Sequence, residues 1–179
     1  VLVKKMLEIL GRERAFIGNG QEGLAVGIYS PIGRSGKSRL AHALCRFWAG
    51  QTEGQHESDM FTPGRSLYLG MEEYGSKSVA METVLYYLKQ RSENLSMQIK
   101  ALAQGQIGVD MIPSAGSYQE LRELDAGDVE WLIRTICREG YYGHVIADIG
   151  TGSLADLRSL LAFDVIYLPC LQDREALLR

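Results

Sequence analysis

The most informative part of the sequence is residues 24–48, LAVGIYSPIGRSGKSRLAHALCRFW. It opens with an apolar run over residues 24–30, which is typical of a short buried strand. A loop over residues 31–36 contains two glycines and leads into a segment whose apolar side chains recur at helical spacing. These side chains are Leu40, Ala41, Leu44, Cys45 and Trp48. The stretch therefore predicts a strand, a glycine-containing loop and a helix in direct succession.

The same alternation continues along the rest of the chain. Further strands are expected at residues 66–70, 109–112, 144–148 and 164–169, and helices at 76–88, 95–103, 128–139 and 154–161. Strands that alternate with helices predict an α/β fold with a mostly parallel sheet and helices on both faces. The strands are continuous apolar runs, which predicts burial on both sides. We expect two parts: a linker helix with a polar connector at 1–22, and an α/β domain at 23–179.

Composition narrows the classes of protein that the chain can represent. Its 179 residues carry a net charge of −3, which argues against a dedicated nucleic-acid binder. No apolar stretch is long enough to span a membrane. Three scattered cysteines form neither a disulfide framework nor a zinc motif, which indicates a reducing cytoplasm. The chain begins with Val1 and stops at Arg179, just after a predicted strand, so we expect a piece of a longer polypeptide that lacks its C-terminal strands.

The loop between the first strand and its helix has the residues of a phosphate-binding site. Its backbone N–H groups and the helix N-terminus would face phosphate oxygens, Lys37 would contact the β- and γ-phosphates, and Ser38 would bind Mg²⁺. The expected nucleotide contacts are Gly33, Arg34, Ser35, Gly36, Lys37 and Ser38. Pro31 stands where the strict motif has its first glycine. The alternative is a helix cap at Ser35 or Ser38 with Lys37 in solvent.

Acidic residues follow two other predicted strands. Asp148 ends the strand 144–148 and could hold the Mg²⁺ through water. Glu72 and Glu73 follow the strand 66–70, and one of them could orient an attacking water. The alternatives are a helix or turn cap at Asp148 and a solvated pair of surface acids at Glu72 and Glu73. His42 and Cys45 have a spacing that could serve a metal, but no third ligand is near, so packing or surface exposure is the expected role.

Together, these residues resemble the ParA/MinD superfamily of deviant-Walker P-loop ATPases, with TadZ/CpaE-like pilus-assembly proteins as the nearest branch. The resemblance rests on residues 28–38, 67–73, 145–152 and 164–169. It implies a P-loop NTPase fold that binds ATP and Mg²⁺ and forms a homodimer around the nucleotide. It implies Lys37, Glu72 and Asp148 as catalytic residues, with Ser38 and Asp148 at the metal. It also implies a positioning role in the cytoplasm, at a cell pole or at the inner membrane face, for pilus or secretion machinery.

The chain departs from the family pattern at several positions. The signature lysine five residues before Lys37 is replaced by Ile32, and Arg34 is the nearest basic residue that could substitute for it. Glu72 is longer than the usual aspartate, and Gly70 stands where an acid or amide is common. Because a missing cation weakens phosphoryl transfer more than binding, we expect weak or no hydrolysis. The alternatives are an active P-loop ATPase or kinase, and a nucleotide-free ParA-like scaffold.

Overall fold

The computed structural model describes residues 23–50, 65–71, 79–106, 108–115, 118–139 and 141–170. The elements in chain order are β1 (Leu24–Ile28), α2 (Lys37–Gly50), β2 (Ser66–Met71), α3 (Val79–Lys89), α4 (Leu95–Leu102), β3 (Gln104–Gln106), β4 (Val109–Ile112), α5 (Tyr118–Arg122), α6 (Ala126–Arg138), β5 (His144–Ile149), the 3-10 helix η2 (Leu157–Ala162) and β6 (Val165–Tyr167). The predicted helix at 3–10 and the connector to residue 22 lie outside the described residues.

The strands form one six-stranded sheet in the order β3-β4-β2-β5-β1-β6. Every neighbouring pair is parallel except β3 and β4, which are antiparallel. In the central register, Asp148 of β5 pairs with Ile28 of β1 on one side and with Gly70 of β2 on the other. The carboxyl ends of the three central strands therefore meet at one edge of the sheet, where ligands bind in α/β proteins.

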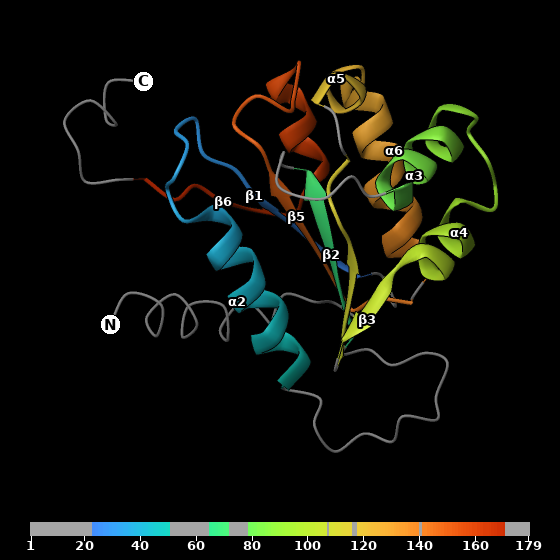
Figure 1. The fold of residues 1–179 in the computed structure, drawn as a ribbon, viewed down its shortest axis with the longest axis horizontal. Coiled ribbons are helices and arrows are strands. Elements are labelled where there is room, and N and C mark those ends of the chain that lie inside the picture. Colours follow the sequence, from blue (N-terminus) through green and yellow to red (C-terminus); the bar gives the residue numbers. More distant parts are fainter. Residues whose placement is uncertain are drawn as a thin grey trace.

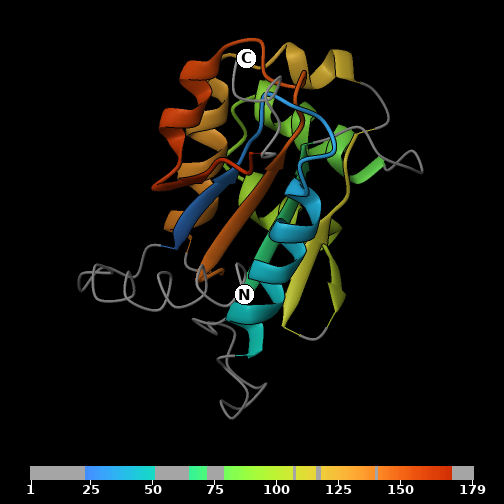
Figure 2. The ribbon, with the colours of Figure 1, turned by 90° about the vertical axis from the view of Figure 1, so that its left-hand side faces the viewer.

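Helices cover both faces of the sheet, as the sequence predicts (Figures 1 and 2). Of the described helices, α2 packs alone on one face, across β1, β5, β2 and β4. The remaining helices gather on the opposite face, where α6 contacts β1 and β5 and packs against η2, α3 and α4. Each face has its own hydrophobic core: Leu44 and Trp48 bury the inner side of α2, whereas Leu88, Leu132 and Ile136 lie in the larger core.

Helix α6 shows how the sequence determines one of these elements. Asp125 is its N-cap, and the Asp125 carboxylate accepts from the backbone N–H of Asp128 while the Asp128 carboxylate accepts from that of Asp125. This reciprocal capping box satisfies two backbone donors that the first turn leaves unpaired. Apolar side chains at helical spacing predict one buried face, and its four residues are all buried: Val129, Leu132, Ile133 and Ile136. The helix therefore begins two residues earlier than expected, at Ala126.

The main differences from the prediction lie at the edges of the sheet. Strand β3 and helix α5 were not anticipated, and the predicted helix at 154–161 is a 3-10 helix at Leu157–Ala162. Burial on both faces, expected for every strand, is wrong for β6, where Ile166 is 37% exposed. Strand β6 has a neighbour only at β1 among the described residues, which explains why it is less covered than the central strands.

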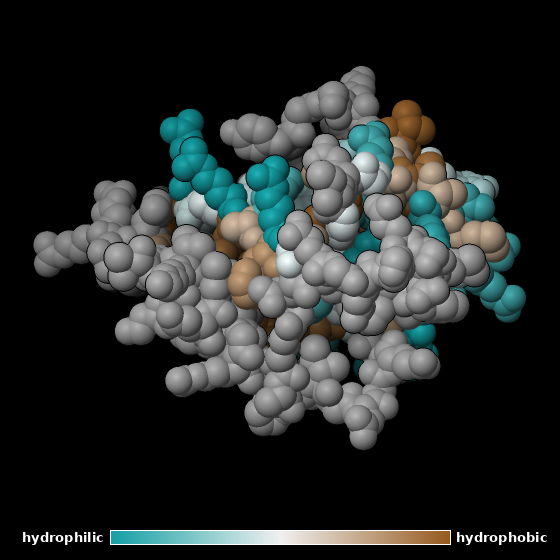
Figure 3. Space-filling model, turned by 90° about the horizontal axis from the view of Figure 1, so that it is seen from below, coloured by the Kyte–Doolittle hydropathy of each residue, from teal (hydrophilic) through white to brown (hydrophobic). Residues whose placement is uncertain are grey.

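The surface of the described part is mixed in character. Figure 3 shows hydrophilic and hydrophobic residues interspersed: hydrophobic residues gather at the upper right, and hydrophilic ones lie beside them at the right-hand edge. Of the helices that the structure describes, none has the length and apolar character that crossing a membrane requires.

Candidate functional site

The loop between β1 and α2 joins the end of a central strand to the N-terminus of a helix, a position where anions bind in many proteins. Ser30 is fully buried, and its Oγ accepts a hydrogen bond from the N–H of Ile32 at 3.3 Å. Two later positions are left-handed, Arg34 with φ 60° and Gly36 with φ 89°. Glycine adopts this conformation freely, whereas an L-residue such as arginine loses roughly 1–2 kcal/mol in it. Helix α2 then begins at Lys37, and its first backbone bond runs from the N–H of Leu40 to the carbonyl of Gly36 at 3.0 Å.

Lys37 is nearly buried at the start of α2, with 3% of its surface exposed. Its Nζ donates to the hydroxyl of Thr151 at 3.4 Å, so the first helix contacts the loop after β5. That loop is held in a turn, because both the N–H and the hydroxyl of Ser153 donate to the carbonyl of Gly150. A buried position ordinarily holds an apolar side chain, since desolvating an ammonium is costly. The burial of Lys37 therefore argues against the helix-cap alternative, which places its ammonium in solvent.

Asp148 lies at the carboxyl end of β5 with 1% of its surface exposed. Its Oδ2 accepts a hydrogen bond from the hydroxyl of Tyr68 on β2 at 3.0 Å. The Tyr68 ring in turn stacks on the His42 imidazole of α2, with ring centroids 4.5 Å apart and planes inclined by 14°. The hydroxyl of Tyr68 on the adjacent strand thus helps to hold the Asp148 carboxylate in place.

These side chains line one pocket of about 660 Å³ at the carboxyl edge of the sheet. Its lining consists of Arg34, Ser35, Gly36, Lys37, Ser38, Arg39, His42, Tyr68, Gly70, Met111, Pro113, Ser114 and Asp148. The hydroxyl oxygen of Ser35 is buried and has no hydrogen-bond partner. An unsatisfied buried hydroxyl in a pocket wall is costly, and an oxygen-rich ligand would satisfy it.

The donor set of the pocket fits a magnesium ion bound together with a phosphate. Ser38 supplies a hydroxyl and Asp148 a carboxylate, and both line the pocket. Mg²⁺ prefers oxygen ligands and is usually held by one or two side chains, waters and substrate phosphates. Within the described ranges there is no cluster of three or more His, Cys, Asp or Glu that could hold a metal. A magnesium ion here would therefore draw most of its ligands from phosphate and water.

Steric contact explains why position 70 is a glycine, and the sequence alone does not reveal this contact. A Cβ at this position would lie 2.7 Å from the backbone nitrogen of Ser114 and 3.3 Å from the carbonyl carbon of Pro113. The loop after β4 thus crosses directly over the end of β2. An acid or amide side chain at position 70 would have to displace that loop.

Cys45 is buried on the inner side of α2 and does not line the pocket. Burial raises the pKa of its thiol to about 12, and the charge of Asp148 adds to the rise. The thiolate that metal binding requires is therefore suppressed. The sequence predicts packing or surface exposure for His42 and Cys45: Cys45 is buried, whereas His42 is exposed, stacks on Tyr68 and lines the pocket.

The structure thus brings five of the six predicted loop residues, Arg34 to Ser38, into one pocket with Asp148, whereas Gly33 does not line it. Glu72 and Glu73 lie outside the described residues, so their role stays a prediction. Sequence reasoning missed Tyr68 and Thr151. Their positions were the only signal: Tyr68 lies in the predicted strand 66–70, and Thr151 lies in the loop after the predicted strand that ends at Asp148.

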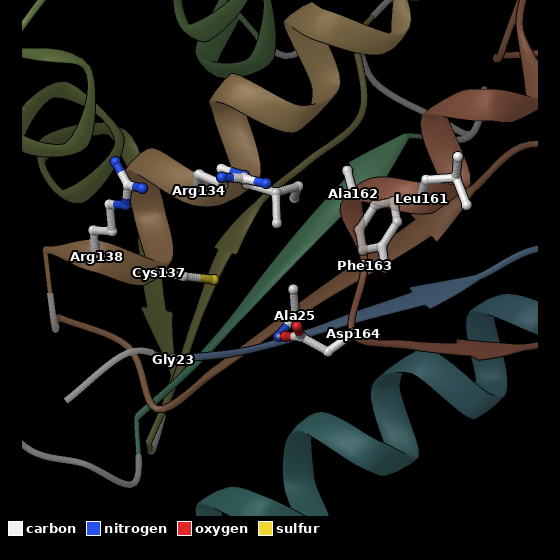
Figure 4. A pocket seen from close by; sticks show the side chains of 10 residues that line it. Gly23, Ala25, Arg134, Cys137, Arg138, Leu161, Ala162, Phe163 and Asp164 are labelled. Atoms are coloured by element: carbon white, nitrogen blue, oxygen red, sulfur yellow. The ribbon is translucent and has the colours of Figure 1, made fainter. Parts of the chain in front are cut away.

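A second cavity, of about 340 Å³, lies between α6, η2 and the amino ends of β1 and β6 (Figure 4). Figure 4 shows Arg134 and Cys137 on its α6 side and Asp164 beside Ala25 on its strand side. The charged groups here have structural partners: Arg134 pairs with Glu130 at 2.6 Å, and Asp164 accepts from the backbone N–H of Ala25 at 2.8 Å. It lies at the amino end of the strands, whereas ligands in open α/β sheets bind at the carboxyl ends.

A mostly parallel α/β sheet, with a buried lysine at the start of the helix after β1 and a buried aspartate near the end of the neighbouring strand, is the arrangement of P-loop folds. The particular fold is that of ParA-family ATPases. The chain is similar to the crystal structure of a ParA family ATPase from Chlorobium tepidum TLS, with a TM-score of 0.58 and 15% identity over 86% of this chain and 63% of that one. It is also similar to a structure described as a plasmid partition protein of Borrelia burgdorferi B31 bound to AMPPNP, with a TM-score of 0.54 and 15% identity over 87% of this chain and 64% of that one.

The chain therefore spans somewhat less than two thirds of each solved chain. No family model matches the sequence, and no curated protein matches it significantly.

Proposed function

We propose that this chain binds ATP with Mg²⁺ in the pocket lined by residues 34–38 and Asp148, as a ParA-like nucleotide-binding protein. One observation carries the proposal: the buried Lys37 and Asp148, from segments far apart in the sequence, line the same pocket at the carboxyl edge of a parallel sheet. Lys37 would contact the β- and γ-phosphates, and the backbone of residues 33–38 would surround them. Ser38 and Asp148 would hold the metal, which supplies charge neutralisation at the phosphates. The AMPPNP in the Borrelia structure supports this ligand class.

Titration calorimetry with Mg²⁺ and AMPPNP tests this function directly. We expect micromolar binding by the wild-type protein and no measurable binding by Lys37→Ala. The matched control is Lys100→Ala, which removes an exposed lysine of α4 whose ammonium lies over the ring of Tyr141 and outside the pocket. Circular dichroism would confirm that both variants are folded. Equal affinity in Lys37→Ala and wild type would overturn the assignment.

We further propose that hydrolysis is weak or absent. In the resembled family a signature lysine contributes a cation across the dimer, and Ile32 at this position cannot supply it. Loss of such a cation weakens the phosphoryl-transfer transition state by several kcal/mol, which lowers the rate of hydrolysis about 10³–10⁵-fold. Steady-state phosphate release separates this proposal from the alternative of an active ATPase or kinase. Turnover near 1 per second or faster would contradict it, since that is the lower end for kinases, about 1–100 s⁻¹.

The resemblance to TadZ/CpaE-like proteins supports two finer proposals: a nucleotide-dependent homodimer, and a role in placing pilus or secretion machinery in the cytoplasm. Ile32→Lys restores the signature lysine, so we expect it to strengthen dimerisation in the presence of AMPPNP. Sedimentation velocity would report the change. No increase over wild type would argue against a nucleotide-bridged dimer.

A further inference from the structure

Arg34 occupies a backbone conformation that its side chain opposes. Its φ of 60° lies in the left-handed region, as does that of Gly36 two residues later in the same loop. At position 36 the sequence meets this requirement with glycine, which has no Cβ to clash. At position 34 it places an arginine, although glycine would adopt the conformation without strain. Strain of this kind persists where the side chain has a compensating role.

One other non-glycine residue of the described chain has a positive φ, and it shows what such compensation looks like. Arg91 has φ 50°, and its Nη2 donates to Oδ1 of Asp128 at 2.7 Å. Its guanidinium also lies over the Trp131 ring, 5.1 Å from the centroid. The ion pair with a buried carboxylate and the ring contact give Arg91 a reason to remain arginine.

No such partner exists for Arg34 in the part of the chain that the structure describes. Its side chain is exposed, takes part in no hydrogen bond or ion pair there, and lines the pocket that holds Lys37 and the unsatisfied hydroxyl of Ser35. The partner that would offset the strain must therefore be anionic and lie in or over the pocket. A polyphosphate meets both requirements, because guanidinium binds phosphate oxygens with paired N–H donors.

We propose that Arg34 contacts the polyphosphate of a nucleotide held by the same subunit, and so adds a positive charge in cis that strengthens binding. The inference rests on the proposed nucleotide-binding function. It adds a specificity-determining residue outside the usual lysine and backbone contacts, and it favours triphosphate over diphosphate because the longer chain offers more anionic oxygens within reach.

Three variants of the full-length protein separate charge from backbone strain. Arg34→Gln keeps the left-handed strain and removes the charge, Arg34→Gly removes both, and Arg34→Lys keeps strain and charge. We expect Arg34→Gln and Arg34→Gly to bind AMPPNP and inorganic tripolyphosphate about tenfold or more weakly, with a smaller loss for ADP, and Arg34→Lys to lie between them and wild type. The salt dependence of binding should also fall in Arg34→Gln, since one ionic contact is lost.

Thermal stability without nucleotide distinguishes this role from a structural one. Arg34→Gly should melt at the wild-type temperature or above, because it relieves strain and breaks no contact within the described structure. The matched variant Arg91→Gly should melt lower, because it breaks the ion pair with Asp128 and the contact with Trp131. A clear loss of stability in Arg34→Gly would overturn the argument from strain.

A mixing experiment tests the placement in cis. Excess Lys37→Ala protein, which carries Arg34 but lacks the phosphate lysine, should leave the affinity of Arg34→Gln for AMPPNP unchanged. Restored affinity would show that Arg34 acts across a dimer and would overturn the proposal. If Arg34→Gln binds AMPPNP as tightly as wild type while Lys37→Ala does not bind, only this inference fails. If the wild-type protein binds no nucleotide, the proposed function fails and this inference with it.

Discussion

Tyr68→Phe removes one atom from the site and leaves the ring in place. The lost hydroxyl donates to Asp148 at 3.0 Å, and both residues are buried, at 8% and 1% exposure. A hydrogen bond to a charged group contributes about 1.5–3 kcal/mol, so we expect the variant to lose about 2 kcal/mol of unfolding free energy. For a chain of this size that loss corresponds to a fall in melting temperature of roughly 4–8 °C.

Urea denaturation at pH 7 without nucleotide measures this loss, and a double-mutant cycle assigns it. In an Asp148→Asn background the acceptor is neutral, so Tyr68→Phe should cost only about 0.5–1.5 kcal/mol. The control is Tyr86→Phe, which alters an exposed tyrosine of α3 and should change stability by less than about 0.5 kcal/mol. A Tyr68→Phe variant as stable as wild type, or an equal effect in both backgrounds, would refute the assignment of this hydrogen bond.

Three further predictions test other parts of the structure. Burial opposes the charge of Asp128, but hydrogen bonds and the basic neighbours Lys89 and Arg91 outweigh burial and lower the pKa of Asp128. The Asp128 carboxylate therefore stabilises the fold fully above its unfolded pKa of about 3.9, and this stabilisation is lost as the pH falls through the lower folded pKa. Asp128→Asn should reduce the loss of stability at acid pH in pH-dependent denaturation. Gly70→Ala should destabilise the fold by about 1–3 kcal/mol, because the new Cβ meets backbone at 2.7 Å, whereas Gly152→Ala, with no atom within 4 Å, should stay within about 0.5 kcal/mol in the same urea assay. Cys45, whose pKa is raised to about 12, should react with an aromatic disulfide far more slowly than the exposed Cys170, and equal rates would contradict its burial.

The sequence predicted those elements whose signal is local. The phosphate loop could be located because a strand, a glycine-containing loop and a helix follow one another within 25 residues, and Asp148 because it ends an apolar run. Strand β3 could not, since its sequence, Gln104-Gly105-Gln106, has no apolar pattern and becomes a strand only by pairing antiparallel with β4.

The contacts that complete the site could not be predicted, because they depend on strand register. Tyr68 reaches Asp148, 80 positions later in the sequence, because β2 and β5 are adjacent and parallel with Gly70 opposite Asp148. Thr151 reaches Lys37 because the turn after β5 returns toward the start of α2. The spacing of residues in the sequence predicts neither of these two contacts.

The residues at positions 70 and 34 therefore have different physical origins. Position 70 is glycine because the backbone at Ser114 leaves no room for a Cβ, so this departure follows from the path of the loop after β4 and requires no change in chemistry. Position 34 is the reverse case: the backbone favours glycine, and the chain carries an arginine at an energetic cost. A glycine that is required because there is no room for a Cβ says little about function. A non-glycine residue in a strained left-handed conformation, by contrast, requires a partner outside the described fold to offset the strain. Position 34 is therefore where a change of ligand chemistry is to be sought, and position 70 is not.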